Sequence, residues 1–254
     1  MSINYLDRVA NARSVPEASD AYLSALREHG FQHGLYIARF LLSLPAAVLR
    51  EEPILFGNFP DGFVARLGAG GLLATAPWAV WALQNSGNAS LRDACLGHED
   101  GAAEIHPAIR LAMDHGVEAG RVISLRNRVP RSHGAVLLCP GGGISHERAE
   151  TAWQSARGEI GILTSVLHLR LATLGRRLVE TRLTQRQREV LEWSSAGKTV
   201  AEIGTILGVA AAPVEKHLRL ARQAIGADTT AHAILRAHLA HQIFPHGQDL
   251  NPFT

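Results

Sequence analysis

Cysteine is nearly absent from the sequence, which contains only Cys95 and Cys139. Two cysteines so far apart cannot form the disulfide framework of a small secreted domain, and they lack the close spacing of a zinc site. Both are therefore predicted to be small buried side chains.

The sequence also lacks a long hydrophobic run. No stretch reaches the roughly 20 apolar residues that a membrane-spanning helix requires. The first residues, which include Asp7 and Asn11, do not have the apolar centre of a secretory signal. We therefore expect a cytoplasmic protein without a membrane partner.

Charge of one sign is not in excess, because the formal net charge is only +2. Whole-molecule electrostatics therefore do not indicate a nucleic-acid-binding protein. Basic residues do accumulate after residue 169, with Glu180 as the only interruption; they are Arg170, Arg176, Arg177, Arg182, Arg186 and Arg188. A solvated helix face explains this accumulation equally well.

Motifs for catalysis and cofactor binding are missing as well. The glycine run at residues 141–143 lacks the spacing and the lysine of a phosphate-binding loop. His238 and His241 are three residues apart, but no carboxylate supports a metal cluster around them. No serine, cysteine or carboxylate pair has a catalytic spacing, so we expect neither an enzyme nor a cofactor or metal.

Helical and strand patterns alternate through the first two thirds of the chain. Apolar residues at helical spacing predict two helices before residue 30, another near residues 109–116, and a long one that Ser145 caps and that runs to residue 174. Strands are predicted at 34–40, 54–59, 122–129 and 135–138, the last two as an antiparallel pair. Residues 61–95 permit only short helices and loops. The pattern predicts an α+β fold, with an α/β/α sandwich around an antiparallel sheet.

The last part of the chain has the pattern of a small helical domain. Its apolar residues fall on the inner faces of four short helices; they are Val190, Leu191, Ile203, Ile206, Leu207, Val214, Leu218, Ile225, Ile234, Leu235 and Leu239. Gly197 and Gly208 mark the sharp turns. In a helix-turn-helix, a second helix over about residues 212–225 would cross the major groove. We expect domains at 1–174 and 183–247, joined by a linker at 175–182.

The segment LTQRQREVLEWSSAGKTVAEIGTILGV at residues 183–209, together with His217 and Ile225-Gly226-Ala227, resembles the LuxR-type DNA-binding domain. The resemblance covers roughly residues 183–244. It implies a helix-turn-helix reader of a palindromic promoter on double-stranded DNA.

Upstream, Gly57-Asn58-Phe59-Pro60, Ala76-Pro77 and Asp114-His115-Gly116-Val117 look like the autoinducer-binding domain of the quorum-sensing members of that family. This weaker resemblance implies a sensor for an acyl-homoserine lactone and a dimer interface in the same domain. The long helix over 146–174 could supply that interface, although its apolar stripe also fits an ordinary core.

The expected ligand pocket departs from the family pattern. The resemblance implies a tyrosine, a tryptophan, a second tyrosine and an aspartate at the places where this chain has Phe59, Phe63, Leu67 and Ala76. Each replacement removes a hydrogen-bonding atom. An unpartnered buried carbonyl costs about 1–3 kcal/mol, so several losses weaken lactone binding by roughly a thousandfold. We expect no response to acyl-homoserine lactone in the usual way.

A pocket of this kind is either filled by its own side chains or open to a small apolar ligand. Its predicted wall consists of Phe59, Phe63, Leu67, Ala76 and Trp78.

The groove-facing helix departs too. Ala210, Pro213 and Glu215 stand where the family resemblance implies a capping hydroxyl, a threonine and a cation. Losing the cap costs about 1 kcal/mol, a first-turn proline is tolerated, and Glu215 would repel phosphates. The remaining candidates for DNA contacts are Lys198, Thr199, Lys216, Arg219 and Arg222.

Two hypotheses follow from these departures. The first is a dimeric DNA-binding transcription regulator whose sensor needs no ligand or answers another signal. The second is a member that binds DNA poorly and inhibits an intact relative by forming a heterodimer with it.

Overall fold

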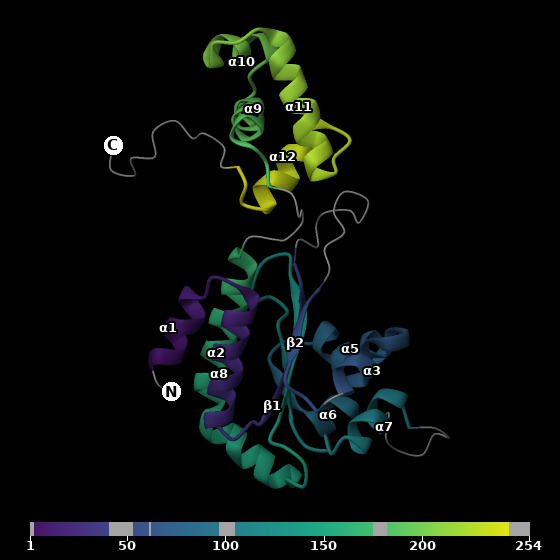
Figure 1. Cartoon of the computed structure of the whole chain (residues 1–254). Coiled ribbons are helices and arrows are strands. Elements are labelled where there is room, and N and C mark those ends of the chain that lie inside the picture. The colour runs from purple at the N-terminus through teal and green to yellow at the C-terminus, as the bar shows by residue number, and fades with distance from the viewer. Residues whose placement is uncertain (1–2, 41–52, 61, 97–104, 175–181, 244–254) are drawn as a thin grey trace. The chain divides into compact units, whose positions relative to one another are not determined.

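The computed structural model describes residues 3–40, 53–60, 62–96, 105–174 and 182–243. They form two compact units, the first ending at Leu174 and the second containing the described residues from 182 onward (Figure 1). The expected linker at 175–182 lies outside the described residues except for Arg182, as do residues 244–247, so both domain limits stay predictions.

The first unit is built on a five-stranded sheet in the order β2-β1-β5-β4-β3. Every neighbouring pair is antiparallel. The strands are β1 (His33–Arg39), β2 (Ile54–Gly57), β3 (Asn88–Ser90), β4 (Arg121–Ser124) and β5 (His133–Cys139). Helices cover both faces, which confirms the predicted α+β sandwich.

One face of the sheet carries the long helices and the other carries short ones (Figure 1). On the first face lie α1 (Ile3–Asn11), α2 (Val15–Glu28) and α8 (His146–Thr173). On the second lie α3 (Phe63–Gly68), η1 (Ala69–Gly71), α4 (Leu72–Thr75), α5 (Pro77–Gln84), α6 (Leu91–Cys95) and α7 (Pro107–Asp114). We call these the long-helix face and the short-helix face.

Apolar side chains point alternately to the two faces of the sheet along the central strands, which explains why helices cover both faces. In β5, Val136 and Leu138 pack into the core of the long-helix face, whereas Leu137 and Cys139 pack into that of the short-helix face. Successive strand residues point to opposite sides, so this strand must be apolar on both. Both cysteines are buried, as predicted, and burial raises the pKa of the Cys139 thiol.

The strand ends differ from the sequence expectation for local reasons. The strand expected over 54–59 ends at Gly57. The Asn58 amide still donates to the Gly34 carbonyl, but the Gly34 amide donates to the Asn58 side-chain oxygen instead of to the Asn58 carbonyl, and the side-chain nitrogen donates to the Gln32 carbonyl. The strand expected over 122–129 ends at Ser124, since the chain turns and Asn127 takes a φ of 65°. Strand β3 has only three residues and no apolar alternation, so the sequence pattern did not predict it.

A chain of buried hydrogen bonds crosses the long-helix face. The Tyr36 hydroxyl lies 2.7 Å from His168 Nδ1, and His168 Nε2 lies 2.9 Å from Ser132 Oγ. Ser132 donates its single proton to the Val129 carbonyl at 2.8 Å. His168 therefore donates from Nε2 and accepts the Tyr36 proton at Nδ1. This arrangement satisfies polar groups that would otherwise destabilise the core.

A second buried pair on this face joins α2 to α8. The hydroxyls of Tyr22 and Thr164 are 2.8 Å apart, and both residues are 0% exposed. Burial raises the pKa of Tyr22, so the phenol stays neutral and acts through its hydrogen bond.

Thr164→Val should lower the free energy of unfolding by about 1–3 kcal/mol, because it keeps the side-chain shape but leaves the buried Tyr22 hydroxyl without this partner. Adding Tyr22→Phe should recover part of that loss, since both polar groups are then gone. Urea denaturation of the single and double variants measures the coupling. Strict additivity of the two losses would show that the pair contributes nothing.

The second unit consists of α9 (Gln185–Ser195), α10 (Val200–Leu207), α11 (Ala211–Ile225) and α12 (Thr230–Leu239). Their apolar faces meet in one core that includes Val190, Ile203, Val214 and Leu218. The predicted four short helices are therefore present, and the expected groove-facing helix is α11. Among the described residues, no helix is long and apolar enough to cross a membrane.

Candidate functional site

The residues predicted to line a ligand pocket lie in one apolar cluster on the short-helix face. Phe59, Phe63, Leu67, Ala76 and Trp78 are 8%, 1%, 1%, 0% and 3% exposed. The Phe59 and Phe63 rings stack with centroids 4.8 Å apart, and the His115 ring lies 5.5 Å from Phe63. Rings of the protein itself therefore fill the space around the expected polar positions.

A cavity of about 490 Å³ lies between the sheet and helices α5, α6 and α7. We call it the sheet-side cavity. Trp78, Leu91, Ile109 and Leu137 contribute to an apolar wall, and polar groups come from Arg92, Glu118 and His146. The size suits a small ligand. Of the five predicted wall residues, Trp78 lines this cavity. The sequence pattern predicted helix α7 but did not show which face of that helix borders a cavity.

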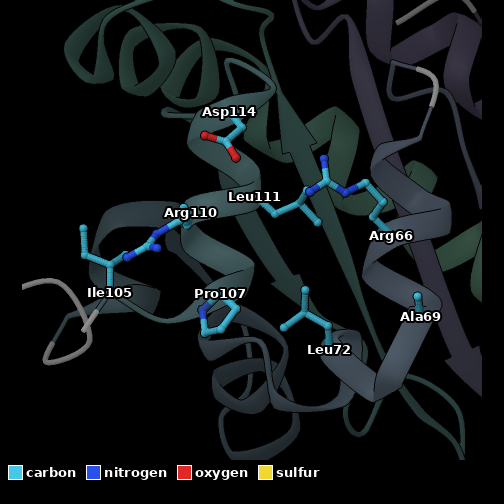
Figure 2. A pocket seen from close by; sticks show the side chains of 8 residues that line it. All are labelled: Arg66, Ala69, Leu72, Ile105, Pro107, Arg110, Leu111 and Asp114. Carbon is cyan, nitrogen blue, oxygen red and sulfur yellow. The ribbon is translucent and has the colours of Figure 1, made fainter.

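A second hollow of about 430 Å³ lies between α3, α4 and α7 and is lined by eight residues (Figure 2). Leu72 and Leu111 contribute to an apolar floor, with Arg66, Arg110 and Asp114 around it. Figure 2 shows Arg66 extending toward Leu111 and Arg110 turned toward Ile105, so the two cations do not converge on one point. Phe59, Phe63, Leu67 and Ala76 are absent from the lining of this hollow and of the sheet-side cavity, as far as the described residues extend.

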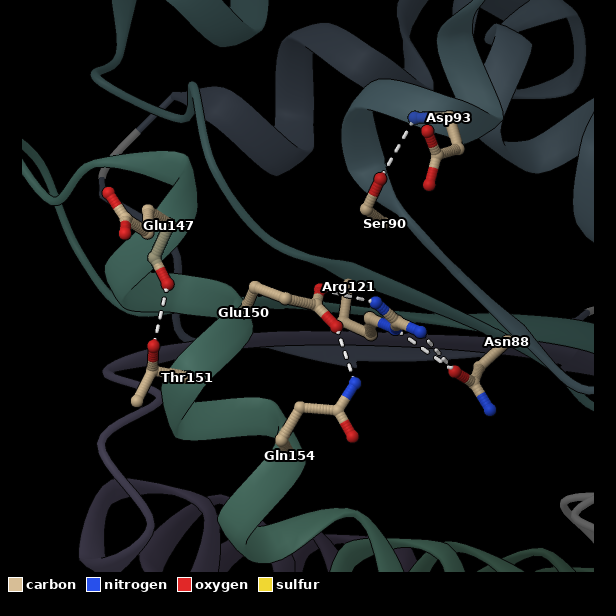
Figure 3. Close-up of polar contacts among 8 residues, drawn as sticks. All are labelled: Asn88, Ser90, Asp93, Arg121, Glu147, Glu150, Thr151 and Gln154. Atoms are coloured by element: carbon tan, nitrogen blue, oxygen red, sulfur yellow. Dashed lines mark hydrogen bonds and ion pairs between the residues drawn. The ribbon is translucent and has the colours of Figure 1, made fainter.

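A polar cluster at the sheet edge fixes the elements around the sheet-side cavity (Figure 3). Arg121 of β4 donates to Glu150 of α8 at 2.6 Å and, through two nitrogens, to Asn88 of β3. Its guanidinium also lies 4.9 Å from the centre of the Trp153 ring. Ser90 caps α6 through the Asp93 amide at 3.0 Å. These contacts position the helix that carries Leu91 and Cys95.

Within the described ranges, no group of three or more His, Cys, Asp or Glu side chains could hold a metal ion. In the sheet-edge cluster, Arg121 and Glu150 form an ion pair.

In the second unit, a tight turn sets α10 against α11. Gly208 ends α10 with a φ of 67°, a conformation that favours glycine. A Cβ at Gly204 would lie 2.8 Å from the Val209 carbonyl oxygen, so the close approach of the two helices requires glycine there. Thr199 caps α10 in a box with Glu202, and these hydrogen bonds lower the pKa of the Glu202 carboxyl.

Helix α11 buries Val214, Leu218, Ala221 and Ile225 and turns its other side to solvent. Lys216 and Arg219 are exposed there, and Lys198 and Thr199 are exposed at the start of α10. Helical spacing places Ala212, Lys216, Arg219 and Gln223 along the line opposite the core.

Arg222 differs from the other four candidates for DNA contacts. It is half-buried, and its guanidinium donates to the Thr230 hydroxyl of α12 at 3.1 Å. The structure therefore places it at the joint between α11 and α12, away from the line that Lys216 and Arg219 share.

Ala210 occupies the cap position of α11 and makes no side-chain hydrogen bond there. Pro213 lies in the first turn, where its missing amide proton has no helical partner to lose. The altered start of the helix is therefore compatible with a full α11 of 15 residues.

Models of two protein families match this chain. The model described as "Autoinducer binding domain" matches residues 14–171, and the one described as "Bacterial regulatory proteins, luxR family" matches residues 181–237. The chain belongs to the LuxR family of quorum-sensing transcriptional regulators. Its two units correspond to the sensor and the helix-turn-helix DNA-binding domain of that family.

Several individual LuxR-family proteins are similar to this chain. The transcriptional repressor ThaA of Burkholderia thailandensis is 25% identical, with 92% of this chain and 94% of ThaA covered. The transcriptional activator protein BjaR1 of Bradyrhizobium diazoefficiens is 43% identical, but the match spans only 27% of this chain and 30% of BjaR1.

The Escherichia coli SdiA crystal structure shares the fold, with a TM-score of 0.56, 20% identity and coverage of 95% and 97%. SdiA in complex with octanoyl-rac-glycerol gives a TM-score of 0.52 at 18% identity, with 96% of each chain covered.

Introducing at position 76 the carboxylate that the family pattern has there should destabilise the sensor domain. Ala76→Asp should lower the free energy of unfolding by about 3 kcal/mol or more, because the site is 0% exposed and apolar. The same change at exposed Ala65 is the control and should cost little. Thermal melts of both variants make the comparison, and equal melting temperatures would refute the close apolar packing around Ala76.

Proposed function

We propose that this regulator binds a palindromic promoter as a dimer and that its sensor does not use acyl-homoserine lactone in the usual way. The observation that carries the proposal is the apolar, fully packed environment of Phe59, Phe63, Leu67 and Ala76. No side-chain hydroxyl, indole nitrogen or carboxylate is available at these four positions to hold a lactone head group.

The sensor side of the proposal has two forms, a domain that folds without ligand and one that binds a small apolar molecule. The sheet-side cavity supports the second form, because its wall is mainly apolar and about 490 Å³ is large enough for an acyl chain. The relative SdiA forms a complex with octanoyl-rac-glycerol. An uncharged acyl ester is therefore a suitable first probe.

Acyl-homoserine lactones of four to twelve carbons should leave the melting temperature of the full chain unchanged, because the positions that hold the lactone head group in the family pattern are the apolar residues Phe59, Phe63, Leu67 and Ala76. Octanoyl glycerol should raise it if the sheet-side cavity binds an apolar ligand. Differential scanning fluorimetry checks both outcomes, with Leu91→Trp as a variant that fills the cavity. A rise of several degrees with any lactone would contradict the proposal.

Dimerisation is supported by α8. Ile162 and Leu169 lie seven residues apart on this helix and are 55% and 57% exposed. Helical spacing puts them on one side, where they can bury apolar surface against a second subunit.

DNA binding is supported by the exposed basic groups at the helix-turn-helix. Lys198 and Thr199 are exposed at the start of α10 and are our candidates for phosphate contacts, whereas Lys216 and Arg219 are exposed on α11 and are our candidates for base contacts. Glu215 adds negative charge beside them.

Arg219→Ala should weaken binding to duplex DNA by about tenfold, and Glu215→Lys should strengthen binding to random duplex, because phosphate neutralisation drives that affinity. Arg188→Ala removes the same charge from an exposed position on α9 and serves as the control. Fluorescence anisotropy at several salt concentrations measures each effect. Equal effects of Arg188→Ala and Arg219→Ala would assign the basic residues to a solvated surface.

The uncapped α11 and the exposed carboxylate of Glu215 favour a second candidate function, inhibition of an intact relative by heterodimerisation. Absence of DNA binding at micromolar concentration, together with a stable complex with a co-expressed LuxR-family regulator, would support this function over the first.

A further inference from the structure

Among the exposed residues in the first two turns of α11, only two neighbouring ones have polar side chains. Residues 210–213 are three alanines and a proline, so none has a side-chain donor or acceptor. Glu215 and Lys216 are the first polar side chains of the helix, and both are exposed. Arg219 follows one turn later. The N-terminal part of a recognition helix faces the base edges, so these three groups dominate what α11 presents there.

The carboxylate of Glu215 differs from those of Glu189 and Glu202 in the same unit. Glu202 is used in the cap of α10, and Glu189 forms an ion pair with Arg186 at 2.8 Å. Glu215 has neither an ion pair nor a side-chain hydrogen bond within the described part of the chain. Lys216 and Arg219 lie close to Glu215 in sequence, but neither forms an ion pair with its carboxylate. Its oxygens therefore remain available to a donor outside the protein.

The major groove offers such a donor. Cytosine presents the N4 amino group, and a glutamate or aspartate accepts from it, whereas arginine and lysine donate to O6 and N7 of guanine. Adenine also presents an amino group, but its adjacent N7 acceptor repels a carboxylate and suits a glutamine amide. Glu215 beside Lys216 and Arg219 thus has the chemistry to recognise cytosine next to guanine. The two cations offset the repulsion between the carboxylate and the phosphates.

We propose that Glu215 reads a cytosine in each half-site by accepting a hydrogen bond from N4, which makes it a specificity determinant of this regulator. The inference rests on the proposed DNA-binding function. On this inference Glu215 selects a base, whereas repulsion from phosphates alone would weaken binding to every DNA sequence equally.

The test is site selection from a random duplex library with the full chain, followed by binding measurements on the selected site. Wild type should select cytosine at one position of each half-site and lose about 5- to 100-fold in affinity when that base is changed. Glu215→Gln should move the preference at that position to adenine, because the amide both accepts from N6 and donates to N7. Glu215→Ala should leave the position without preference.

Asp228→Asn is the matched control, since it removes one negative charge from an exposed position just beyond α11. It should leave every base preference unchanged. Circular dichroism checks that all variants keep their helices.

Two results would overturn the inference: one refutes only the base contact of Glu215, and the other refutes DNA binding itself. If Glu215→Gln and Glu215→Ala bind all duplexes more tightly by one common factor, with the selected bases unchanged, Glu215 only repels phosphates. If wild type selects no sequence and binds no duplex at low salt, the DNA-reading function itself fails, and the base contact fails with it.

Discussion

Strands β1 and β5 are buried on both faces, and the architecture of the sensor unit depends on this constraint. A strand with Val136 and Leu138 on one side and Leu137 and Cys139 on the other needs helices on both. The long-helix face meets this need with the 28-residue α8, so its polar groups must pair inside the core. The chain from Tyr36 through His168 to Ser132 does so. Both ligand-sized hollows described above lie on the short-helix face.

The short-helix face is covered by brief elements, and α4 has only four residues. The sheet-side cavity lies beneath three of these short helices, α5, α6 and α7, on the same face as the stacked phenylalanines. Because the family's polar positions are apolar here, a ligand would be held by buried area. Each buried methylene contributes about 0.8 kcal/mol, so an eight-carbon chain gains roughly 6 kcal/mol before the cost of ordering. Apolar contact alone thus supports a modest affinity.

Periodicity was sufficient for the long elements and insufficient for the cavity. The helix starting at Ser145 and most of the apolar faces of α9 to α12 follow from spacing, because one side of each must be buried. The prediction was wrong for Ile206, which spacing put on the inner face of α10 and which is 43% exposed. The end of β2 at Gly57 was not predictable, since it depends on Asn58 bonding to a distant strand. Nor could spacing show that Leu91, Ile109 and Leu137, far apart in sequence, border the same cavity. Tertiary contacts decide both.

Under the proposed recognition by Glu215, the start of α11 would combine a loss of stability with a gain in selectivity. Replacing a capping hydroxyl by Ala210 costs about 1 kcal/mol, whereas the buried residues Val214, Leu218, Ala221 and Ile225 each contribute burial of similar or greater size. The helix therefore holds its position through the core without the cap. Residues 210–213 have no side-chain donor or acceptor, so under the proposed recognition by Glu215 a larger share of the base contacts of α11 would fall on Glu215, Lys216 and Arg219. Such a reader would depend on one matched carboxylate, because that same negative charge lowers its general affinity for phosphate.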